Sequence, residues 1–331
     1  MGDVILTTPI VHAVKKKFPG ALIDIITSTQ YAEIYKFSPY INEILDYDKS
    51  LSHKANQENL KRHMSMIRIK KYDLIIDLQN NYRSHALLKG LGTKTVRYKK
   101  NNLAKFLLIH FKIRMGKVTH VVDKYFQTIK QFGIENAGFG LELWLHRDFN
   151  KGVYTPYDKN YFHKIIITIA PGAHFKTKRW PADNFVALIK KLISSYSCEI
   201  ILIGGEDDVP LCKYIQSKLS LRIQNLSGSR SILETVDAIE NSNVLITNDT
   251  GIMHIASARK LPVIALFGST TTDFGFTPYR TSNIIVEAIT PCRPCTHIGR
   301  DECPKKHFDC MYDISVSQVF DAFRKIMKLP V

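Results

Sequence analysis

Short apolar runs alternate with longer amphipathic stretches along most of this chain. Residues 164–169, 199–203 and 262–267 are rich in Ile, Val and Leu and are flanked by polar residues, Gly or Pro, which is typical of strands buried on both faces. The stretches between such runs repeat apolar residues every three or four positions, as helices do. Alternating strands and helices predict a parallel sheet with helices on both faces, so the expected fold class is α/β.

The same pattern gives the bounds of the expected elements. In the first half, strands are expected at 21–27, 43–47, 72–78 and 95–98, and helices after residue 3 and near 32–37, 55–70, 82–90 and 120–132. In the second half, strands are expected at 164–169, 199–203, 244–247, 262–267 and 283–287, and helices at 183–196, up to 219, at 231–240, from 251 and at 315–327. Asp183 and Ser231 are expected to cap two of these helices.

A polar stretch at 147–160, which contains Gly and Pro, predicts a linker between two domains. The domains would then be residues 1–150 and 160–331. A length of 331 residues, with 45% hydrophobic residues, is enough for two domains that each have a core.

The polar tip at 248–251 is where we expect a binding site. An apolar strand ends at Thr247, Asn-Asp-Thr-Gly follows, and a helix then opens. Small-molecule sites form at the carboxyl ends of parallel strands. Helix N-terminal N–H groups bind phosphate and a carboxylate accepts hydrogen bonds from hydroxyls, so the tip predicts a phosphorylated, hydroxyl-rich ligand.

Two further strand ends carry candidate ligand-binding residues. The loop at 171–181 follows a strand and precedes a helix, and its Lys176, Lys178 and Arg179 suit a pyrophosphate. Surface lysines are the alternative, and the strand–loop–helix context favours the phosphate interpretation. Glu206 follows the next strand, where its carboxylate suits ribose hydroxyls, although a plain turn explains it equally well.

Asp3 stands where the first helix begins. A carboxylate in this position usually caps the helix. It could instead act as a general base that removes a proton from an acceptor hydroxyl. The sequence alone leaves both roles open.

Four cysteines lie within 19 residues near the C-terminus, at Cys292, Cys295, Cys303 and Cys310. This spacing, with its Cys-x2-Cys pair, predicts a structural zinc or iron site. Reduced thiols packed as small apolar side chains are the alternative. A metal held by four thiolates keeps no open position, so we expect it to take no part in catalysis. Cys198 and Cys212 are expected to lie in the core.

The formal net charge of +16 is unevenly distributed. Residues 53–118 hold 16 Lys and Arg against three Asp and Glu. Such an excess indicates either a solvated basic face or an anionic partner, namely nucleic acid, an anionic membrane surface or a phosphorylated substrate. Aromatic residues are not interleaved with these charges, which argues against nucleic acid. No membrane-spanning or signal-peptide pattern is present, so a cytoplasmic location is expected.

Several of these motifs together resemble glycosyltransferase family 9, whose best-known members are the lipopolysaccharide heptosyltransferases. The resemblance rests on Gly2-Asp-Val-Ile-Leu-Thr-Thr-Pro9, Phe18-Pro-Gly20, Lys178-Arg-Trp-Pro181, Thr247-Asn-Asp-Thr-Gly-Ile-Met-His254 and Leu266-Phe-Gly-Ser-Thr270. These motifs cover nearly the whole chain in the expected order. The clustered cysteines also recur in members of the family.

The resemblance implies a GT-B fold, in which two Rossmann-like domains face each other across a cleft. It implies an inverting transfer of heptose from ADP-heptose to the lipopolysaccharide inner core, on a Kdo-lipid A or heptosyl-Kdo-lipid A acceptor, with no cofactor required for catalysis. The expected location is then the cytoplasm, in peripheral contact with the anionic inner membrane.

The resemblance also implies roles for individual residues. Asp3 matches the catalytic base, and Thr7, Arg62 and Arg68 are guessed to contact the acceptor, although surface or capping roles explain these three as well. The residues matched to donor binding are Lys178, Glu206, Asp249, Thr250, Gly251 and His254, with His254 expected mainly to brace the start of its helix.

One departure from the family is that no strand precedes Asp3. A helix that opens on a Gly-Asp turn normally follows a strand, so we expect the first strand of the N-terminal domain to be missing from this chain, about 10 residues in all. Two alternatives to the heptosyltransferase remain: a GT-B transferase that uses another nucleotide sugar or a protein acceptor, and a basic nucleic-acid-binding protein.

Overall fold

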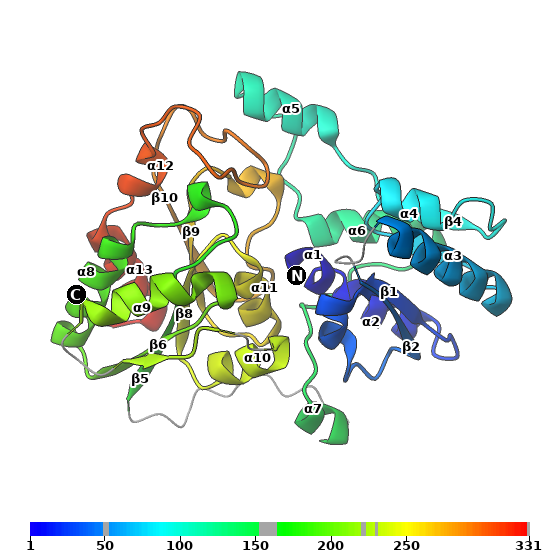
Figure 1. Cartoon of the computed structure of the whole chain (residues 1–331), viewed down its shortest axis with the longest axis horizontal. Helices are drawn as coiled ribbons and strands as arrows, with labels where there is room; N and C mark the ends of the chain where they lie inside the picture. The colour runs from blue at the N-terminus through cyan, green and yellow to red at the C-terminus, as the bar shows by residue number, and fades with distance from the viewer. Residues whose placement is uncertain (49–52, 152–163, 220–222, 229–230, 330–331) are drawn as a thin grey trace. The chain divides into compact units, whose positions relative to one another are not determined.

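The computed structural model describes residues 1–48, 53–151, 164–219, 223–228 and 231–329, and they form two compact units (Figure 1). The first unit comprises Met1, Asp3–Asn101 and Thr119–Tyr154, and the second comprises Gly2, Asn102–Val118 and Thr155–Val331. The segment 102–118 thus groups with the second unit, although it precedes the expected linker. Most of that linker, residues 152–160, lies outside the described residues.

The second unit is built on a six-stranded parallel sheet. Its strands are β5 (Ile165–Ala170), β6 (Cys198–Leu202), β7 (Gln224–Asn225), β8 (Val244–Asn248), β9 (Val263–Phe267) and β10 (Asn283–Glu287). The spatial order is β10-β9-β8-β5-β6-β7, and every pairing is parallel. Numbered within the unit and read from β7, this is 3-2-1-4-5-6, the order of a Rossmann sheet, and the order reverses between β5 and β8.

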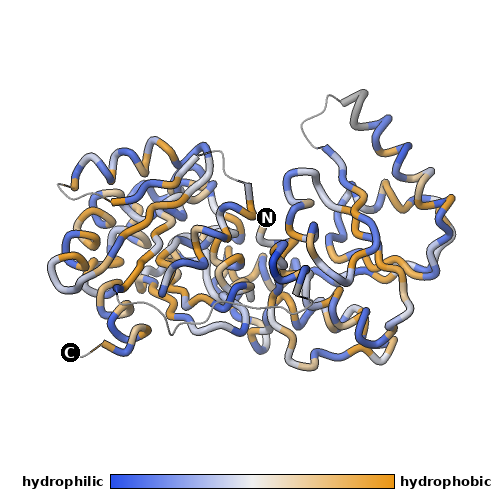
Figure 2. Tube along the Cα trace, turned by 90° about the horizontal axis from the view of Figure 1, so that it is seen from below, coloured by the Kyte–Doolittle hydropathy of each residue, from blue (hydrophilic) through white to orange (hydrophobic). Residues whose placement is uncertain are grey.

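Several helices of the second unit connect these strands, and others precede or follow the sheet in sequence. They are α5 (Asn102–Phe111), α8 (Ala182–Ser195), α9 (Val209–Ser217), α10 (Ile232–Glu240), α11 (Gly251–Ala258), α12 (Asp309–Tyr312) and α13 (Val316–Met327), with short 3-10 helices η4 (Lys176–Lys178), η5 (Glu206–Asp208) and η6 (Thr272–Phe274). Hydrophobic and hydrophilic positions alternate along the helices of this unit (Figure 2). Ser231 and Ser315 cap α10 and α13 through capping boxes.

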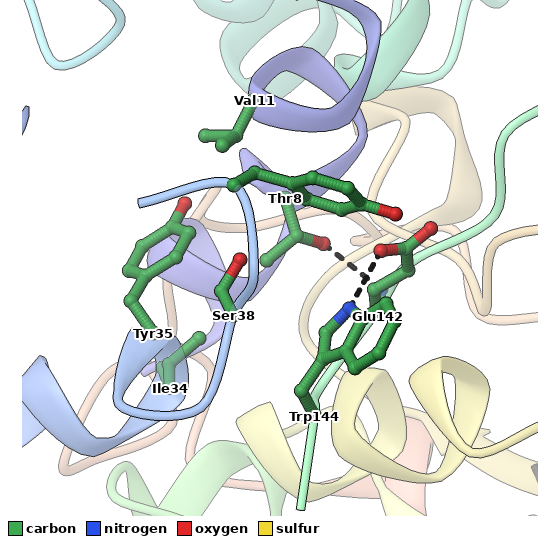
Figure 3. Close-up of a pocket in the computed structure, with 8 residues that line it drawn as sticks. Thr8, Val11, Ile34, Tyr35, Ser38, Glu142 and Trp144 are labelled. Carbon is green, nitrogen blue, oxygen red and sulfur yellow. Dashed lines mark hydrogen bonds between the residues drawn. The ribbon is translucent and has the colours of Figure 1, made fainter. Parts of the chain in front are cut away.

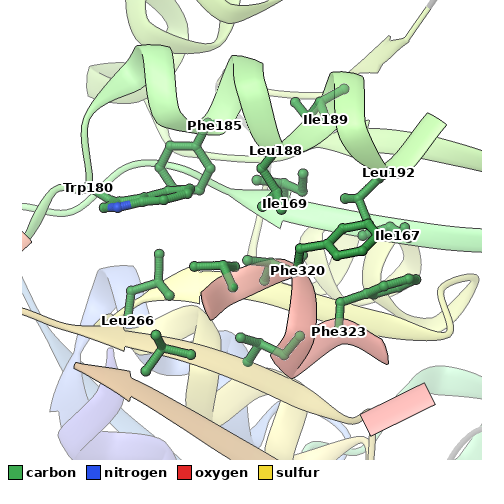
Figure 4. Packing of buried hydrophobic residues seen from close by; sticks show 14 of the residues in the cluster. Ile167, Ile169, Trp180, Phe185, Leu188, Ile189, Leu192, Leu266, Phe320 and Phe323 are labelled. Atoms are coloured by element: carbon green, nitrogen blue, oxygen red, sulfur yellow. The ribbon is translucent and has the colours of Figure 1, made fainter. Parts of the chain in front are cut away.

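The core of the second unit forms where α8 and α13 pack on the sheet. Phe185 and Leu188 of α8 and Phe323 of α13 belong to one hydrophobic cluster, and all three are fully buried (Figure 4). Ile167 and Ile169 of β5 lie beneath them. Cys212 belongs to this core, as the sequence predicts, whereas Cys198 is only partly buried and packs against it.

The first unit contains two separate pairs of parallel strands among its described residues. β1 (Asp24–Ser28) pairs with β2 (Glu43–Tyr47), and β3 (Ile75–Asp77) pairs with β4 (Thr95–Arg97). Its helices are α1 (Gly2–Ile5), α2 (Thr8–Lys17), η1 (Thr29–Tyr35), α3 (His53–Lys70), α4 (Tyr82–Leu87), α6 (Val121–Ile129), η2 (Lys130–Phe132) and α7 (His146–Lys151).

Some local expectations are wrong. The helix expected near 32–37 is the 3-10 helix η1. Asp183 does not cap α8, because the helix begins one residue earlier and the Asp183 carboxylate instead accepts a hydrogen bond from the Tyr214 hydroxyl. Helices α5 and α7 and the short strand β7 were not expected. None of the helices in the described part of the chain combines the length and apolar character that crossing a membrane requires.

We expect Phe323→Ala to destabilise the second unit by about 3–5 kcal/mol, because it leaves a cavity between α13 and α8. Urea unfolding followed by fluorescence measures the change. Tyr312→Ala, at a side chain that is 60% exposed in the same unit, is the matched control and should cost under about 1 kcal/mol. Equal effects of the two substitutions would contradict the assigned core.

Candidate functional site

The candidate site lies at the carboxyl ends of β5 and β8, where the order of the sheet reverses. These strands pair side by side, with Ala170 opposite Thr247 at their ends. The loops that follow them therefore emerge together, one carrying Lys178 and the other Asp249. Ligands of open α/β sheets bind at such a switch point, because the loops on either side of it diverge to opposite faces.

Asp249 has two partners contributed by two other strand ends. Lys178 Nζ lies 2.6 Å from Asp249 Oδ2, and both side chains are largely buried. The Thr270 hydroxyl, which follows β9, donates to the same oxygen over 2.7 Å. Charge-assisted hydrogen bonds of this kind are the strong ones, so the carboxylate and the ammonium are held in fixed positions.

Asn248 ties the two loops together beneath this cluster. Its side chain is fully buried; its amide nitrogen donates to the carbonyls of Pro171 and Gly172, and its oxygen accepts from the backbone N–H of Trp180. Trp180 is itself anchored, since its indole N–H donates to Ile314 O over 2.9 Å. The loop that carries Lys178 is thus fixed at both ends.

The cysteine-rich segment supports the same loops from the side. Arg293 donates to the carbonyls of Gly268 and Thr270 and to the Glu287 carboxylate. Thr177, next to Lys178, exchanges hydrogen bonds with the backbone of Arg300. Residues 293–300 therefore position both the Lys178 loop and the Thr270 loop.

The tip between β8 and α11 offers backbone donors beside this cluster. α11 begins at Gly251, and Thr250, its N-cap residue, makes no side-chain capping bond. The first N–H groups of the helix are therefore not satisfied by that side chain and suit an anion. With the Lys178 ammonium nearby, the site combines positive groups for a phosphate with the Asp249 carboxylate for hydroxyls.

The other residues expected to bind the donor lie on neighbouring elements. His254 is buried within α11, and its bracing role remains a prediction. Glu206 is exposed in η5, which follows β6, the strand beside β5. Lys176 is exposed, whereas Lys178 is mostly covered. The structure thus brings Lys178, Asp249, Thr250 and Gly251 together and leaves Glu206 at the adjacent strand end.

Sequence reasoning missed three residues of this site, Asp208, Thr270 and Arg293. Asp208 accepts from the backbone N–H of Gly205, and burial raises its pKa above the ordinary value. Its carboxylate fills the space beside Gly172, since a Cβ on that glycine would lie 2.0 Å from Asp208 Oδ1. The Gly-Gly at the end of β6 was the available signal for Asp208, whereas only the fold brings Thr270 and Arg293 near Asp249.

Asp3 lies in the first turn of α1, in the first unit, and is exposed. Because α1 begins at Gly2, Asp3 does not occupy the N-cap position. Burial, and then the Asp3 carboxylate, raise the pKa values of Tyr31, Tyr98 and Tyr125. The Asp3 carboxylate therefore acts electrostatically on three phenols, which stay protonated.

The three guessed acceptor contacts differ in their surroundings. The Thr7 hydroxyl donates to Val4 O and also contacts the Tyr35 hydroxyl, so it has partners inside the first unit. Arg62 and Arg68 are exposed on α3. None of the three is tested by these positions, and all remain predictions.

A small pocket in the first unit lies close to the start of α2 (Figure 3). Thr8, Tyr35, Glu142 and Trp144 are among its lining residues. The Glu142 carboxylate accepts from the Trp144 indole over 2.9 Å and pairs with His12 over 2.6 Å. The polar groups of this pocket are thus largely engaged with one another, and none of the predicted site residues lines the pocket.

The four clustered cysteines are close enough to influence one another. Burial first, and then the neighbouring thiols, raise the pKa of Cys295 and bring that of Cys310 to about 12. Cys310 lies in the core cluster, and Cys292 Sγ is 3.7 Å from His307 Nε2. Over the described ranges, no three or more His, Cys, Asp or Glu side chains are arranged to hold a metal ion, so the metal site remains a prediction.

Comparisons with known proteins place these features in a family. Residues 60–306 match glycosyltransferase family 9 (heptosyltransferase). Lipooligosaccharide heptosyltransferase 2 of Campylobacter jejuni is 27% identical, over 98% of this chain and 96% of that protein.

Two solved structures share the fold. A glycosyl transferase of family 9 from Veillonella parvula matches with a TM-score of 0.77 and 22% identity, over 99% of this chain and 94% of that one. ADP-heptose LPS heptosyltransferase II of E. coli matches with a TM-score of 0.71 and 19% identity, over 99% and 96%. Both matches span nearly all of this chain.

We expect Gly172→Ala to destabilise the second unit by about 1–3 kcal/mol, since the new methyl group overlaps the Asp208 carboxylate. Gly205→Ala is the matched control, because a Cβ there meets nothing within 4 Å. Adding Asp208→Ala to Gly172→Ala should remove part of the cost, which a double-mutant cycle from urea unfolding measures. A neutral Gly172→Ala would contradict the close approach.

Proposed function

Because this chain belongs to glycosyltransferase family 9, and is therefore a glycosyltransferase with the GT-B fold, we propose that it transfers heptose from ADP-heptose to the inner core of lipopolysaccharide. The acceptor is Kdo-lipid A or heptosyl-Kdo-lipid A. The observation that carries the proposal is the cluster of Lys178, Asp249 and Thr270 at the switch point of a Rossmann sheet. The name of the E. coli structure, which includes ADP-heptose, supports this choice of donor.

The second unit holds the donor in this proposal. The diphosphate of ADP-heptose lies against the N-terminus of α11 and the Lys178 ammonium, and Asp249 accepts hydrogen bonds from heptose hydroxyls. Glu206, at the end of β6, takes the ribose hydroxyls. Thr250 and Gly251 supply backbone N–H groups, and His254 braces the helix from within.

The first unit supplies the base in this proposal. Asp3 removes the proton from the acceptor hydroxyl as its oxygen attacks the anomeric carbon, and ADP departs from the opposite side with inversion. The charge that grows on the leaving phosphate is stabilised by Lys178 and the helix N–H groups, positions already fixed before the reaction. These groups perform the neutralisation without a divalent metal.

The proposed acceptor contacts follow from the positive charge of residues 53–118. Arg62 and Arg68 belong to the basic segment 53–118, which attracts the phosphates and acidic sugars of the lipopolysaccharide core. Such an acceptor is carried by lipid, so the enzyme works in the cytoplasm in peripheral contact with the anionic inner membrane.

The test of the proposal is a transfer assay with defined truncated lipopolysaccharide acceptors, read by mass spectrometry. ADP-heptose should give a product larger by one heptose, UDP- and GDP-sugars should give none, and EDTA should leave the rate unchanged. Transfer from a UDP- or GDP-sugar instead would favour a GT-B transferase with another donor.

Asp3→Ala should lower kcat by about 10²–10⁴-fold, the usual contribution of a general base. Binding of ADP-heptose, measured by calorimetry, should change little, because Asp3 belongs to the other unit. Asp73→Ala, at an exposed carboxylate of the same unit, serves as the control and should retain full activity. Normal turnover by Asp3→Ala would rule out the base.

Thr270→Val should raise the Kd for ADP-heptose about tenfold or more, because it removes a buried hydrogen bond to the Asp249 carboxylate. Thr270→Ser keeps the hydroxyl and should restore binding. Since Thr270 acts through Asp249, Thr270→Val should add little to the defect of Asp249→Asn. Independent, additive losses would show that Thr270 does not act through that carboxylate.

A further inference from the structure

The segment 102–118 turns large apolar side chains towards solvent. α5, at the top of Figure 1, stands away from the sheet of its unit, and residues 112–118 continue from it. Six large apolar side chains of this segment are between 50% and 63% exposed: Leu103, Phe106, Phe111, Ile113, Met115 and Val118. We call these six residues the α5 surface.

Leu108 of α5 is buried, and polar contacts also attach this segment to the rest of the second unit. Lys112 Nζ donates to the carbonyls of Cys292 and Pro294 over 2.9 and 2.7 Å. Arg114 Nε pairs with Asp273 Oδ2 over 3.0 Å. A surface helix ordinarily packs its large apolar side chains inward. α5 buries Leu108 but leaves Leu103, Phe106 and Phe111 exposed, so these side chains present a contact surface.

Charge distinguishes between the kinds of partner that fit the α5 surface. Residues 102–118 contain Lys105, Lys112, Arg114 and Lys117 and no acidic residue. A symmetric contact with a second copy would bring these cations against one another, which is unfavourable. A bilayer with anionic headgroups instead accepts both parts, the apolar side chains below the headgroups and the cations among them.

We propose that the α5 surface docks on an anionic lipid bilayer, with Leu103, Phe106 and Phe111 entering the interface and Lys105 and Lys117 at the headgroups. This proposal rests on the proposed function, in which a lipid-carried acceptor brings the enzyme to the membrane. It names the residues that make that contact. It also assigns that contact to the unit that holds the donor, separately from the basic helix α3 of the first unit.

The experiment is sedimentation of the full chain with vesicles of phosphatidylcholine, with or without phosphatidylglycerol. The chain should bind the anionic vesicles, bind phosphatidylcholine alone weakly, and lose affinity as salt rises. Leu103→Ser/Phe106→Ser/Phe111→Ser should weaken binding about tenfold or more, and Lys105→Gln/Lys117→Gln by about tenfold. Each variant should keep the thermal unfolding midpoint of the parent.

The matched control is Leu22→Ser/Tyr82→Ser/Phe149→Ser, which removes three exposed apolar side chains of the first unit and should leave vesicle binding unchanged. Transfer to a soluble, lipid-free acceptor should be equal in the parent, the α5 triple variant and the first-unit control, so failure of the docking surface and failure of the proposed activity give different results. Vesicle binding by the α5 triple variant at the parental level would overturn the proposal. So would a parent that dimerises through this surface, shown by a monomeric triple variant in light scattering.

Discussion

The ion pair between Lys178 and Asp249 depends on one constraint, the side-by-side pairing of β5 and β8. These strands are 74 residues or more apart in sequence, and a sheet in simple sequential order would place their ends far from each other. The reversal of strand order brings the two loops together at one edge. Asn248 then fixes their separation, because a single buried amide bonds to both the beginning and the end of the Lys178 loop.

The cysteine-rich segment helps to hold the same loops in position. Arg293 and the backbone of Arg300 hold the Thr270 and Lys178 loops from outside the sheet. Anything that orders or loosens this segment changes the position of the groups around Asp249. The location of the cysteines is therefore informative, because the segment that carries them is hydrogen-bonded to both loops.

The sequence predicted the second unit well because its strands are continuous apolar runs ended by polar tips, and strand ends in a parallel sheet share one edge. Lys178 and Asp249 could be placed together on that ground alone. Thr270 and Arg293 could not, since their roles arise from strand order and from a loop with no periodic pattern. Asp183 shows the local limit: it looks like a cap, but a tertiary hydrogen bond to Tyr214 engages its carboxylate instead. The periodicity of α5 also fails to say which of its two sides faces solvent.

Under the proposed function, the ion pair between Lys178 and Asp249 affects which ligands the donor site binds. Without a ligand, each charge has the other as its partner in a largely buried place. A free phosphate that paired with the Lys178 ammonium would leave the Asp249 carboxylate without its cation. A free sugar that hydrogen-bonded the carboxylate would leave the ammonium without its anion. Either case costs the free energy of an unpaired buried charge. A nucleotide sugar brings phosphate and hydroxyls together, so it replaces both partners at once. The ion pair thus favours the intact donor over either of its parts, which is the discrimination a transferase needs before the bond between them is broken.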